Sequence, residues 1–383
     1  MSARRTREVS SLDIARLLAA QAVMFYHLVF LSWAEAERSR GIRAVVGNPV
    51  IFSGSQGWAS LGWVGVQIFF VISGFVILMS AENKTASDFL IGRIARIVPG
   101  LWVFSTISAL VLLGCGVLPA RELAIRLMRS LALFPVGPWV DGAVWTLVTE
   151  AVFYGAVFAF IKTGTISRIT SIMIALTIFN LMLWGAVLSG EAGIFGDAGR
   201  EIASLAASYK LRVTLVTTNC YFVAGAALYQ MFMRRSLRIN AVIFAANYTA
   251  SLISTYYAGL SSVGVSRFGQ DPLAAAEVWG VATLVMSACV LSRVGSGPRF
   301  VRLATIAGLV TYPLYLINQI TGGFILGAMY RTGLAPMVCV ILAAVFCTGL
   351  AGLFALLLER PLQVRLRGFL KRFERGARVL KEA

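Results

Sequence analysis

The stretch "WASLGWVGVQIFFVISGFVILMS", residues 58–80, decides the fold, and it contains no charged side chain. A helix of about 20 mostly apolar residues is long enough to cross the hydrocarbon core of a bilayer. Comparable apolar runs recur along the whole chain. None of them shows the alternating pattern of about ten residues that is typical of membrane β-barrel strands. The sequence therefore predicts an all-α integral membrane protein.

The apolar runs predict a bundle of about ten transmembrane helices. We expect these helices at residues 12–31, 58–80, 98–118, 143–162, 167–189, 210–233, 239–259, 273–292, 302–329 and 334–358. The first run is longer than the core of a signal peptide, which indicates a retained span. The ninth run is long and contains Pro313, so we expect that helix to be broken or tilted.

Charged residues make up 13% of the chain, against about 25% in a typical soluble domain. The 34 Lys and Arg residues outnumber the 17 Asp and Glu residues, giving a net charge of +17. Most of these cations lie near the N-terminus, in alternate connectors and in the C-terminal tail. The positive-inside rule then places both termini in the cytoplasm of a multi-pass protein. The same placement argues against nucleic-acid binding, because no separate basic domain exists.

The connectors are too short for a soluble domain. We expect one membrane domain, residues 1–361, followed by a basic cytoplasmic tail, residues 362–383, whose Leu and Phe residues recur at the spacing of an amphipathic surface helix. A second amphipathic helix is expected in "RELAIRLMRSLALF", residues 121–134, on the outer surface.

The five cysteines are scattered without a CxxC pair, and the chain has one histidine, so no metal site is expected.

That histidine, His27, lies in the outer half of the first span, within "AQAVMFYHLVFLSW", residues 20–33. Ionisable side chains inside spans are costly, so each is a functional candidate. His27 is either a polar residue hydrogen-bonded to another helix or a catalytic base or acyl carrier, since imidazole titrates near neutral pH. Glu150, in the fourth span, falls at a similar depth. It is either a neutral hydrogen-bonding group or, if it faces His27, the orienting partner of that base.

Cationic side chains gather at the inner ends of two spans. Asp13 and Arg16 have the i, i+3 spacing of an ion pair at a helix end. Arg93 and Arg96 lie one helical turn apart, before Pro99. They either flank the span as topology signals or clamp phosphate oxygen atoms. Inner cations suit an anionic, phosphate-bearing cosubstrate, which would need a long arm to reach groups in the outer half.

The ninth span contains "TYPLYLINQ", residues 311–319, in which hydrogen-bonding side chains stand among aliphatic ones. They are Tyr312, Tyr315, Asn318 and Gln319, and Asn318 falls toward the outer half. Hydrogen bonding between helices is the simpler explanation for such residues. The alternative is a polar site that they share with His27 and Glu150, because no soluble domain is present to carry the chemistry.

Six segments, in order along the chain, carry a family resemblance. They are "LDIARLLAAQAVMFYH" (12–27), "VGVQIFFVISGFVI" (64–77), "RIARIVP" (93–99), "WTLVTEAVFY" (145–154), "TYPLYLINQ" (311–319) and "LERP" (358–361). Together they resemble the integral-membrane acyltransferase-3 family, which O-acetylates bacterial exopolysaccharides, lipopolysaccharide O-antigens, nodulation factors and some macrolides. The resemblance covers nearly the whole chain.

The resemblance implies an O-acyltransferase of the bacterial inner membrane, with acyl-CoA, usually acetyl-CoA, arriving from the cytoplasm. The acceptor would be a hydroxyl of an exported or cell-surface carbohydrate or glycolipid. His27 takes the place of the family's essential histidine and Glu150 that of its span-four glutamate. The implied cofactor-binding positions are Asp13, Arg16, Arg93 and Arg96. The implied pocket positions are Ser73, Trp145, Tyr154, Tyr312, Tyr315 and Asn318.

The chain departs from the family pattern at Ala15, where Leu is usual, and at Asn318, where many members have a second histidine. It also lacks the soluble esterase-like domain that some members carry. Two other classes of function remain in view, a transporter and a noncatalytic component of a polysaccharide export complex. A macrolide or another small molecule is the alternative acceptor.

Overall fold

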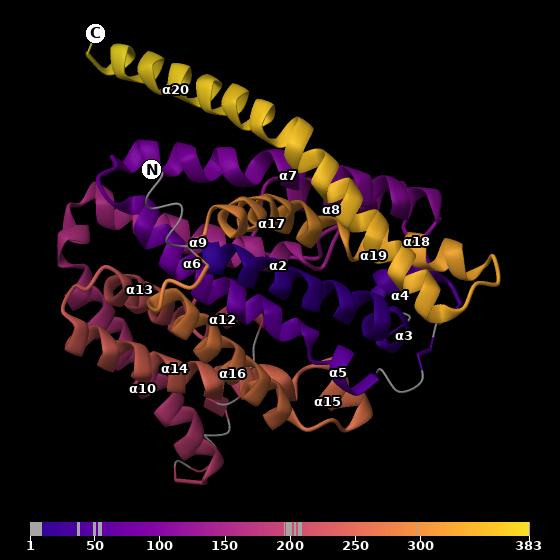
Figure 1. The fold of residues 1–383 in the computed structure, drawn as a ribbon, viewed down its shortest axis with the longest axis horizontal. Coiled ribbons are helices and arrows are strands. Elements are labelled where there is room, and N and C mark those ends of the chain that lie inside the picture. The colour runs from indigo at the N-terminus through magenta and orange to yellow at the C-terminus, as the bar shows by residue number, and fades with distance from the viewer. Residues whose placement is uncertain are drawn as a thin grey trace.

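The computed structural model describes residues 10–36, 39–48, 51–52, 56–194, 196, 201–202, 204–205, 209–295 and 297–382. All regular secondary structure of these residues is helical (Figure 1). The helices are α2 (Ser10–Phe25), η1 (Tyr26–Leu31), α3 (Ser32–Ala34), α4 (Ile42–Val46), α5 (Gln56–Ala59), η3 (Gly62–Val64), α6 (Gly65–Ala81), α7 (Ala86–Gly114), α8 (Ala120–Leu131), α9 (Val144–Lys162), η4 (Thr165–Arg168), α10 (Ile169–Glu191), α12 (Tyr209–Val213), α13 (Asn219–Phe232), α14 (Leu237–Leu260), α15 (Val263–Phe268), α16 (Pro272–Leu291), α17 (Pro298–Ile317), α18 (Ile320–Tyr330), α19 (Pro336–Leu353), η5 (Phe354–Glu359) and α20 (Arg360–Glu382).

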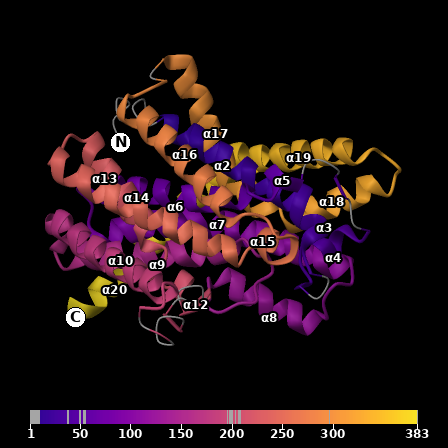
Figure 2. The same cartoon turned by 90° about the horizontal axis from the view of Figure 1, so that it is seen from below.

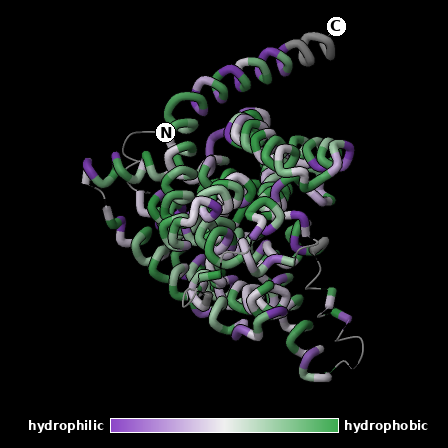
Figure 3. Tube along the Cα trace, turned by 90° about the vertical axis from the view of Figure 1, so that its right-hand side faces the viewer, coloured by the Kyte–Doolittle hydropathy of each residue, from purple (hydrophilic) through white to green (hydrophobic). Residues whose placement is uncertain are grey.

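Eight helical segments of the described residues are long and apolar enough to cross a membrane. They are Ser10–Ala34, Gly57–Ala81, Ala86–Gly114, Val144–Lys162, Thr165–Glu191, Pro272–Leu291, Pro298–Ile317 and Pro336–Arg375. Figure 3 shows apolar residues along the helices of the bundle, and hydrophilic residues at many connections and along the last helix. The predicted class, an all-α multi-pass membrane protein, is confirmed.

Two of the ten predicted spans, 210–233 and 239–259, are not among these eight segments. The first corresponds to α12 and α13, and α13 has only 14 residues, fewer than the roughly 20 that cross a bilayer. The second corresponds to α14, which has 24 residues but buries polar side chains such as Asn240, Asn247 and Thr255. Polar side chains lower the hydropathy of a helix even where they are buried inside the protein.

The helix α2 packs against α6, which follows it closely in the chain, and against α17, which lies nearly 300 residues later. The closest helix pair is α6 with α13, where two glycines allow the backbones to meet. A Cβ atom on Gly225 would lie 1.9 Å from the carbonyl oxygen of Val71, and one on Gly74 would lie 2.1 Å from that of Phe222. Small residues at a crossing let membrane helices approach closely.

A polar network ties α10, α13 and α14 into one unit, and Figures 1 and 2 both show these helices together. The amide nitrogen of Asn180 donates to the oxygen atoms of Asn219 and Asn247, each at 2.8 Å. The amide nitrogen of Asn247 donates in turn to Thr177 at 2.7 Å. Buried amides without partners are costly, so this network selects one packing of the three helices.

The long ninth run is broken, as expected, but the break does not fall at Pro313. The helix α17 continues through Pro313 to Ile317, and α18 begins at Ile320. The two residues between them, Asn318 and Gln319, are both buried. Broken helices inside membrane proteins are tolerated where the freed backbone groups face protein or a cavity.

Two segments adopt the rare π-helical form, η1 at Tyr26–Leu31 and η5 at Phe354–Glu359. The first contains His27 and the second ends at Glu359. A π-helical turn shifts the side chains that follow it relative to an α-helix, and such turns occur frequently at functional sites. Both residues contribute to the site described below.

The predicted amphipathic helix near residues 121–134 is observed as α8. The predicted tail is helical up to Glu382 and continues directly from α19 and η5. Its helix, α20, lies against the first turn of α7, where Lys371 pairs with Asp88 at 2.9 Å and Ser87 donates to Glu374 at 2.6 Å. Figure 1 shows the end of α20 extending beyond the bundle.

Candidate active site

Two adjacent cavities lie among the spans. The first has a volume of about 360 Å³. Its polar lining comes from α2, α6, α7, α9 and α17, and consists of Asp13, Arg16, Ser73, Arg93, Arg96, Thr146, Glu150, Tyr154, Thr305, Thr311, Tyr312 and Tyr315. The helices α2 and α17 approach closely here, because a Cβ atom on Gly308 would lie 2.7 Å from Asp13 Oδ1. The cavity therefore has five helices to fix its polar groups in place.

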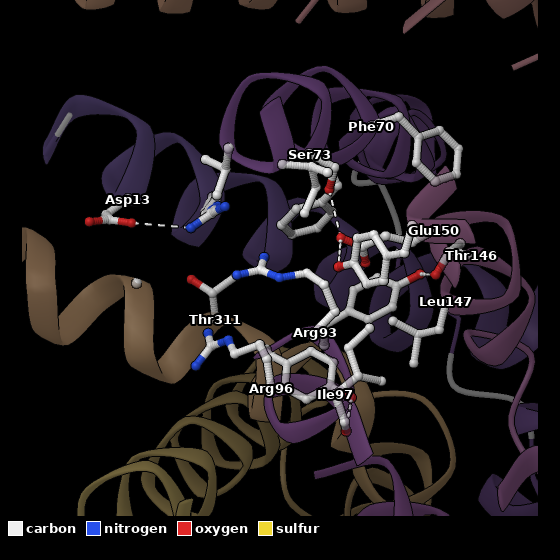
Figure 4. A pocket seen from close by; sticks show the side chains of 18 of the residues that line it. Asp13, Phe70, Ser73, Arg93, Arg96, Ile97, Thr146, Leu147, Glu150 and Thr311 are labelled. Carbon is white, nitrogen blue, oxygen red and sulfur yellow. Dashed lines mark hydrogen bonds and ion pairs between the residues drawn. The ribbon is translucent and has the colours of Figure 1, made fainter. Parts of the chain in front are cut away.

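Three guanidinium groups reach this first cavity. Arg16 lies 3.4 Å from Asp13 on the same helix, and Arg96 lies 2.5 Å from Glu359. Arg93 forms no ion pair with the described residues, and its buried Nε has no hydrogen-bond partner among them. Its guanidinium group stands 5.9 Å from the ring centre of Tyr154, within cation–π range. Figure 4 shows Arg93 and Arg96 projecting into the same space.

Glu150 is the acceptor of a hydrogen-bond cluster at the other end of this cavity (Figure 4). Its Oε1 accepts from the hydroxyl of Ser73 at 2.9 Å and from the hydroxyl of Tyr154 at 2.5 Å. The carboxylate is thus held toward the cationic lining of the first cavity.

Tyr312 connects α17 to the proline-containing part of α7. Its hydroxyl donates to the carbonyl oxygen of Ile97 at 2.7 Å, and its ring centre lies 5.9 Å from the guanidinium carbon of Arg96. The ring fits against α7 because residue 100 is glycine, whose added Cβ would lie 2.7 Å from Tyr312. Tyr312 therefore fixes the segment that carries Arg93 and Arg96.

The second cavity has a volume of about 250 Å³ and contains the only histidine. Its polar and aromatic lining consists of Tyr26, His27, Trp63, Gln67, Trp145, Arg212, Ser261, Ser262, Tyr315 and Gln319. The cavity thus combines a titratable ring with aromatic faces and amide groups. It has one cationic side chain, Arg212, where the first cavity has three.

The tautomer of His27 follows from its partner, Asn318, which is fully buried behind it. The amide nitrogen of Asn318 donates to the carbonyl oxygens of Leu314 and Tyr315, both at 2.9 Å. Both amide protons are therefore used, and the remaining Oδ1, 2.5 Å from His27 Nδ1, must accept. Nδ1 carries the ring proton, so the lone pair of the neutral imidazole is on Nε2, as a base or nucleophile requires.

Val66 and Tyr315 line both cavities and form the wall between them. The hydroxyl of Tyr315 lies 2.9 Å from the hydroxyl of Thr146, and its ring meets Phe69 edge to face at 5.5 Å between ring centres. Val66 belongs to α6 and Tyr315 to α17. The cavity that contains the arginines therefore adjoins the cavity that contains His27.

Asp141, in the connector before α9, lies next to the second cavity, whose lining includes Gly142 and Ala143. Its Oδ1 accepts from the backbone N–H of Ala143 at 2.8 Å. Burial raises the pKa of Asp141 to about 7, although backbone N–H groups of Ala143 and Ile320 act to lower it. The carboxyl thus caps the start of α9 next to the second cavity.

The structure divides the residues named from the sequence between two cavities, and it does not bring His27 and Glu150 into contact. The first cavity collects Asp13, Arg16, Ser73, Arg93, Arg96, Glu150, Tyr154, Tyr312 and Tyr315, and the second collects His27, Trp145 and Tyr315. His27 bonds to Asn318, whereas Glu150 bonds to Ser73 and Tyr154, so the anticipated direct pair of His27 and Glu150 is not formed.

Sequence reasoning did not single out Glu359 or Gln67, and it named Gln319 only as a hydrogen-bonding group of the ninth span. Glu359 holds Arg96 from the second π-helix, and Gln67 and Gln319 line the second cavity. Each had a signal, because each is a lone polar residue within or beside an apolar run, in "LLLERP", "VGVQIFF" and "YLINQ". Such residues are functional candidates wherever they occur in a span.

The site thus consists of a polar cavity rich in arginine next to a cavity that contains the histidine, inside a bundle of apolar helices. A family model described as an acyltransferase domain matches residues 9–358, nearly the whole chain. The protein belongs to the acyltransferase-3 family. The resemblance seen in the six sequence motifs is thereby confirmed.

A similar protein is the exopolysaccharide production protein ExoZ of Rhizobium meliloti (strain 1021). The two are 26% identical over 322 residues, which cover 79% of this chain and 90% of the relative. No solved structure matched the chain.

Proposed function

We propose that the protein transfers an acyl group, most simply acetyl, from acyl-CoA to a hydroxyl of an exported or cell-surface carbohydrate. The observation that carries the proposal is the adjacency of the two cavities, one cationic and one containing His27, across the wall of Val66 and Tyr315. The polysaccharide as acceptor is supported by the name of the related protein, which takes part in exopolysaccharide production.

In this proposal the first cavity binds the donor. The phosphate groups of CoA bind Arg93, Arg96 and Arg16, since guanidinium groups form strong paired hydrogen bonds with phosphate oxygens. Arg93 is the principal anchor because it lacks an ion pair among the described residues. Apolar side chains in the same lining suit the neutral pantetheine arm and include Val66, Phe69, Val76, Ile97 and Leu147.

The thioester then reaches His27 by passing between Val66 and Tyr315. His27 Nε2 takes the proton of the acceptor hydroxyl, whose oxygen forms a bond to the acyl carbon as the carbon–sulfur bond breaks. The proton moves from His27 to the sulfur, and CoA leaves as a free thiol. Donor plus alcohol therefore gives ester plus CoA, with no other reactant.

The scheme uses direct transfer, with His27 as the base. The ring becomes cationic when Nε2 takes the proton, because Nδ1–H bonds to an Asn318 oxygen that cannot take its proton. An acyl group on Nε2 would make the same cation, so the mass of the protein after a single turnover distinguishes the two routes. Glu150 acts in the first cavity in this scheme, where it sets the electrostatic field around the arginines.

The membrane orientation completes the proposal. Both termini lie in the cytoplasm of a bacterial inner membrane, acyl-CoA enters from that side and the acceptor enters from the opposite side. The distribution of Lys and Arg supports this orientation, and the bacterial source of the relative supports the membrane.

The test uses protein purified without a histidine tag, inserted in vesicles with acetyl-CoA and the producing cell's polysaccharide. Release of CoA thiol and ester formation on the glycan should occur together, and His27→Gly should abolish both. Added imidazole should restore part of the activity, because the chain has no other histidine. Full activity of His27→Gly would overturn the catalytic role. Movement of an intact solute without thiol release would instead identify a transporter.

In cells, surface acylation separates an enzyme from a noncatalytic component of an export complex. His27→Gly should remove the acyl groups from the surface glycan while the amount of exported polysaccharide persists. Unchanged acylation would support the noncatalytic role. Acyl groups found on a macrolide and not on a glycan would show that the acceptor is a small molecule. The proposed transfer from acyl-CoA would still hold.

A further inference from the structure

The second cavity contains two buried amide oxygens without partners. Gln67 is 5% exposed and Gln319 is 6% exposed, and both line the cavity. The Oε1 atom of each has no hydrogen-bond partner among the described residues. An amide oxygen removed from water without a partner costs about 1–3 kcal/mol. Two such side chains among the lining residues of one cavity therefore indicate a ligand that supplies donors.

The two amides come from separate parts of the fold and are held in place. Gln67 lies on the first turn of α6, and Gln319 lies in the break between α17 and α18. The amide of Gln319 rests against Gly142, where an added Cβ atom would lie 3.0 Å from Oε1. Asn318, the partner of His27, is the residue next to Gln319. The break between α17 and α18 thus supplies Asn318, which is the hydrogen-bond partner of His27, and Gln319, which lines the cavity.

The rest of the lining suits a sugar. Trp63, Trp145 and Tyr26 provide aromatic surfaces, which bind the apolar face of a pyranose ring. The volume of about 250 Å³ is below the range of about 300–1,000 Å³ typical of sites for drug-sized ligands. That space suits a single glycosyl unit, with the remainder of a chain outside the cavity.

We propose that the second cavity is the acceptor subsite, in which Gln67 and Gln319 accept hydrogen bonds from hydroxyl groups of one glycosyl unit. A further hydroxyl of that unit faces His27 and is acylated. This inference rests on the proposed function and assigns the residues that select the acceptor. Hydrogen bonds from two hydroxyl groups to the fixed amide oxygens orient the sugar, and this orientation determines which hydroxyl faces His27. The two amides therefore govern both the affinity for the acceptor and the choice of the hydroxyl that is acylated.

The experiment compares Gln67→Leu and Gln319→Leu with Gln230→Leu. Gln230 is the matched control because it is 3% exposed and its Oε1 also has no partner, yet it lies on α13 and lines neither cavity. Each cavity variant should raise the KM for the acceptor about tenfold, since the loss of one hydrogen bond of about 1.4 kcal/mol corresponds to that factor. The KM for acetyl-CoA should change less than about twofold, and Gln230→Leu should match the wild type.

Gln67→Glu and Gln319→Glu keep an oxygen acceptor and should retain much of the acceptor affinity, which a purely structural role would not predict. Binding of methyl β-D-glucopyranoside and methyl β-D-galactopyranoside, followed by tryptophan fluorescence, gives a readout independent of transfer. A glycoside should quench the wild type, and both Leu variants should weaken that binding.

The two proposals fail in different ways. Transfer by the wild type with unchanged acceptor KM in both Leu variants would overturn the subsite and leave the acyltransferase function standing. Glycoside binding that depends on Gln67 and Gln319, without any acyl transfer, would retain the subsite and overturn the function. Equal losses for donor and acceptor in the Leu variants would show a general structural effect and would also overturn the subsite.

Discussion

Nδ1 of His27 lies 2.5 Å from Oδ1 of Asn318, a residue 291 positions later in the chain. Asn318 can accept only because its two amide protons are held by carbonyl oxygens of its own helix. An asparagine in this environment performs the orienting task that a carboxylate performs for many catalytic histidines. The pair shows how a neutral residue fixes a tautomer.

Replacing Asn318 with Leu should lower kcat by at least about 100-fold, in the range typical of general acid–base catalysis, because the ring loses its orientation and its preferred tautomer. The KM for acetyl-CoA should change little, since the first cavity is intact. Initial rates at varied acetyl-CoA give both constants. Thr321→Val is the matched control, because the Thr321 hydroxyl is buried without a described partner. An active Asn318→Leu enzyme would contradict the role of the pair.

Arg93→Ala should raise the KM for acetyl-CoA about tenfold or more, because a hydrogen bond to a charged group contributes about 1.5–3 kcal/mol. Arg93→Lys should recover part of the affinity through its charge but not the paired geometry. Kinetics with acetyl-CoA and binding of free CoA measure the effect. Arg235→Ala serves as the control, since Arg235 is paired with Glu82 away from the cavities. A KM equal to that of the wild type would remove Arg93 from the donor site.

Val66→Trp should abolish transfer while CoA still binds, because the indole fills the passage between the cavities. Val66→Leu, which adds one methylene, should retain measurable activity. Thermal stabilisation by CoA reports binding, and thiol release reports transfer. Loss of both in the Trp variant would mean that the substitution disrupts the first cavity, whereas retention of both would show that the thioester takes another route.

Asp141 gives a pH dependence of stability with a defined sign. Its pKa is raised to about 7 in the folded protein, whereas an unfolded Asp titrates near 3.9. The folded state therefore binds the proton more tightly, so the contribution of this group is complete below about pH 4 and is lost as the pH rises through 7.

Asp141→Asn keeps an oxygen for the N–H of Ala143 but cannot ionise. The decrease in Tm between about pH 4 and 7 should be smaller in this variant than in the wild type. Thermal unfolding of the detergent-solubilised protein at a series of pH values measures the slope. Asp271→Asn, which changes an exposed capping residue of α16, is the control. Identical slopes for Asp141→Asn and the wild type would contradict the assignment.

Much of the fold could be predicted from the sequence, because eight of the ten expected spans consist of long apolar runs. The predicted run 239–259 forms the helix α14, Leu237–Leu260, but its hydropathy does not place it among the eight apolar segments. Its Asn247 and Thr255 bond to other helices, which hydropathy along one chain does not reveal. The ninth span, which contains Pro313, was expected to be broken or tilted, and it is broken at Asn318 and Gln319.

The sequence predicted which residues belong to the site better than it predicted which of them contact each other. Asp13 and Arg16 share one helix, so their contact followed from spacing. The contacts of His27 with Asn318 and of Arg96 with Glu359 join residues 291 and 263 positions apart, and both involve a π-helical segment. A one-residue shift of helical phase changes which side chains face each other, and no spacing rule anticipates it.

The wall of Val66 and Tyr315 also bears on the permeability of the bilayer. An enzyme that takes its donor from one compartment and its acceptor from the other holds two polar chambers back to back, each a potential leak for protons and ions. A flexible, uncharged pantetheine arm can slip between two side chains that exclude a hydrated ion. In the proposed function, the cell would modify its exterior with a cytoplasmic metabolite without discharging its membrane potential.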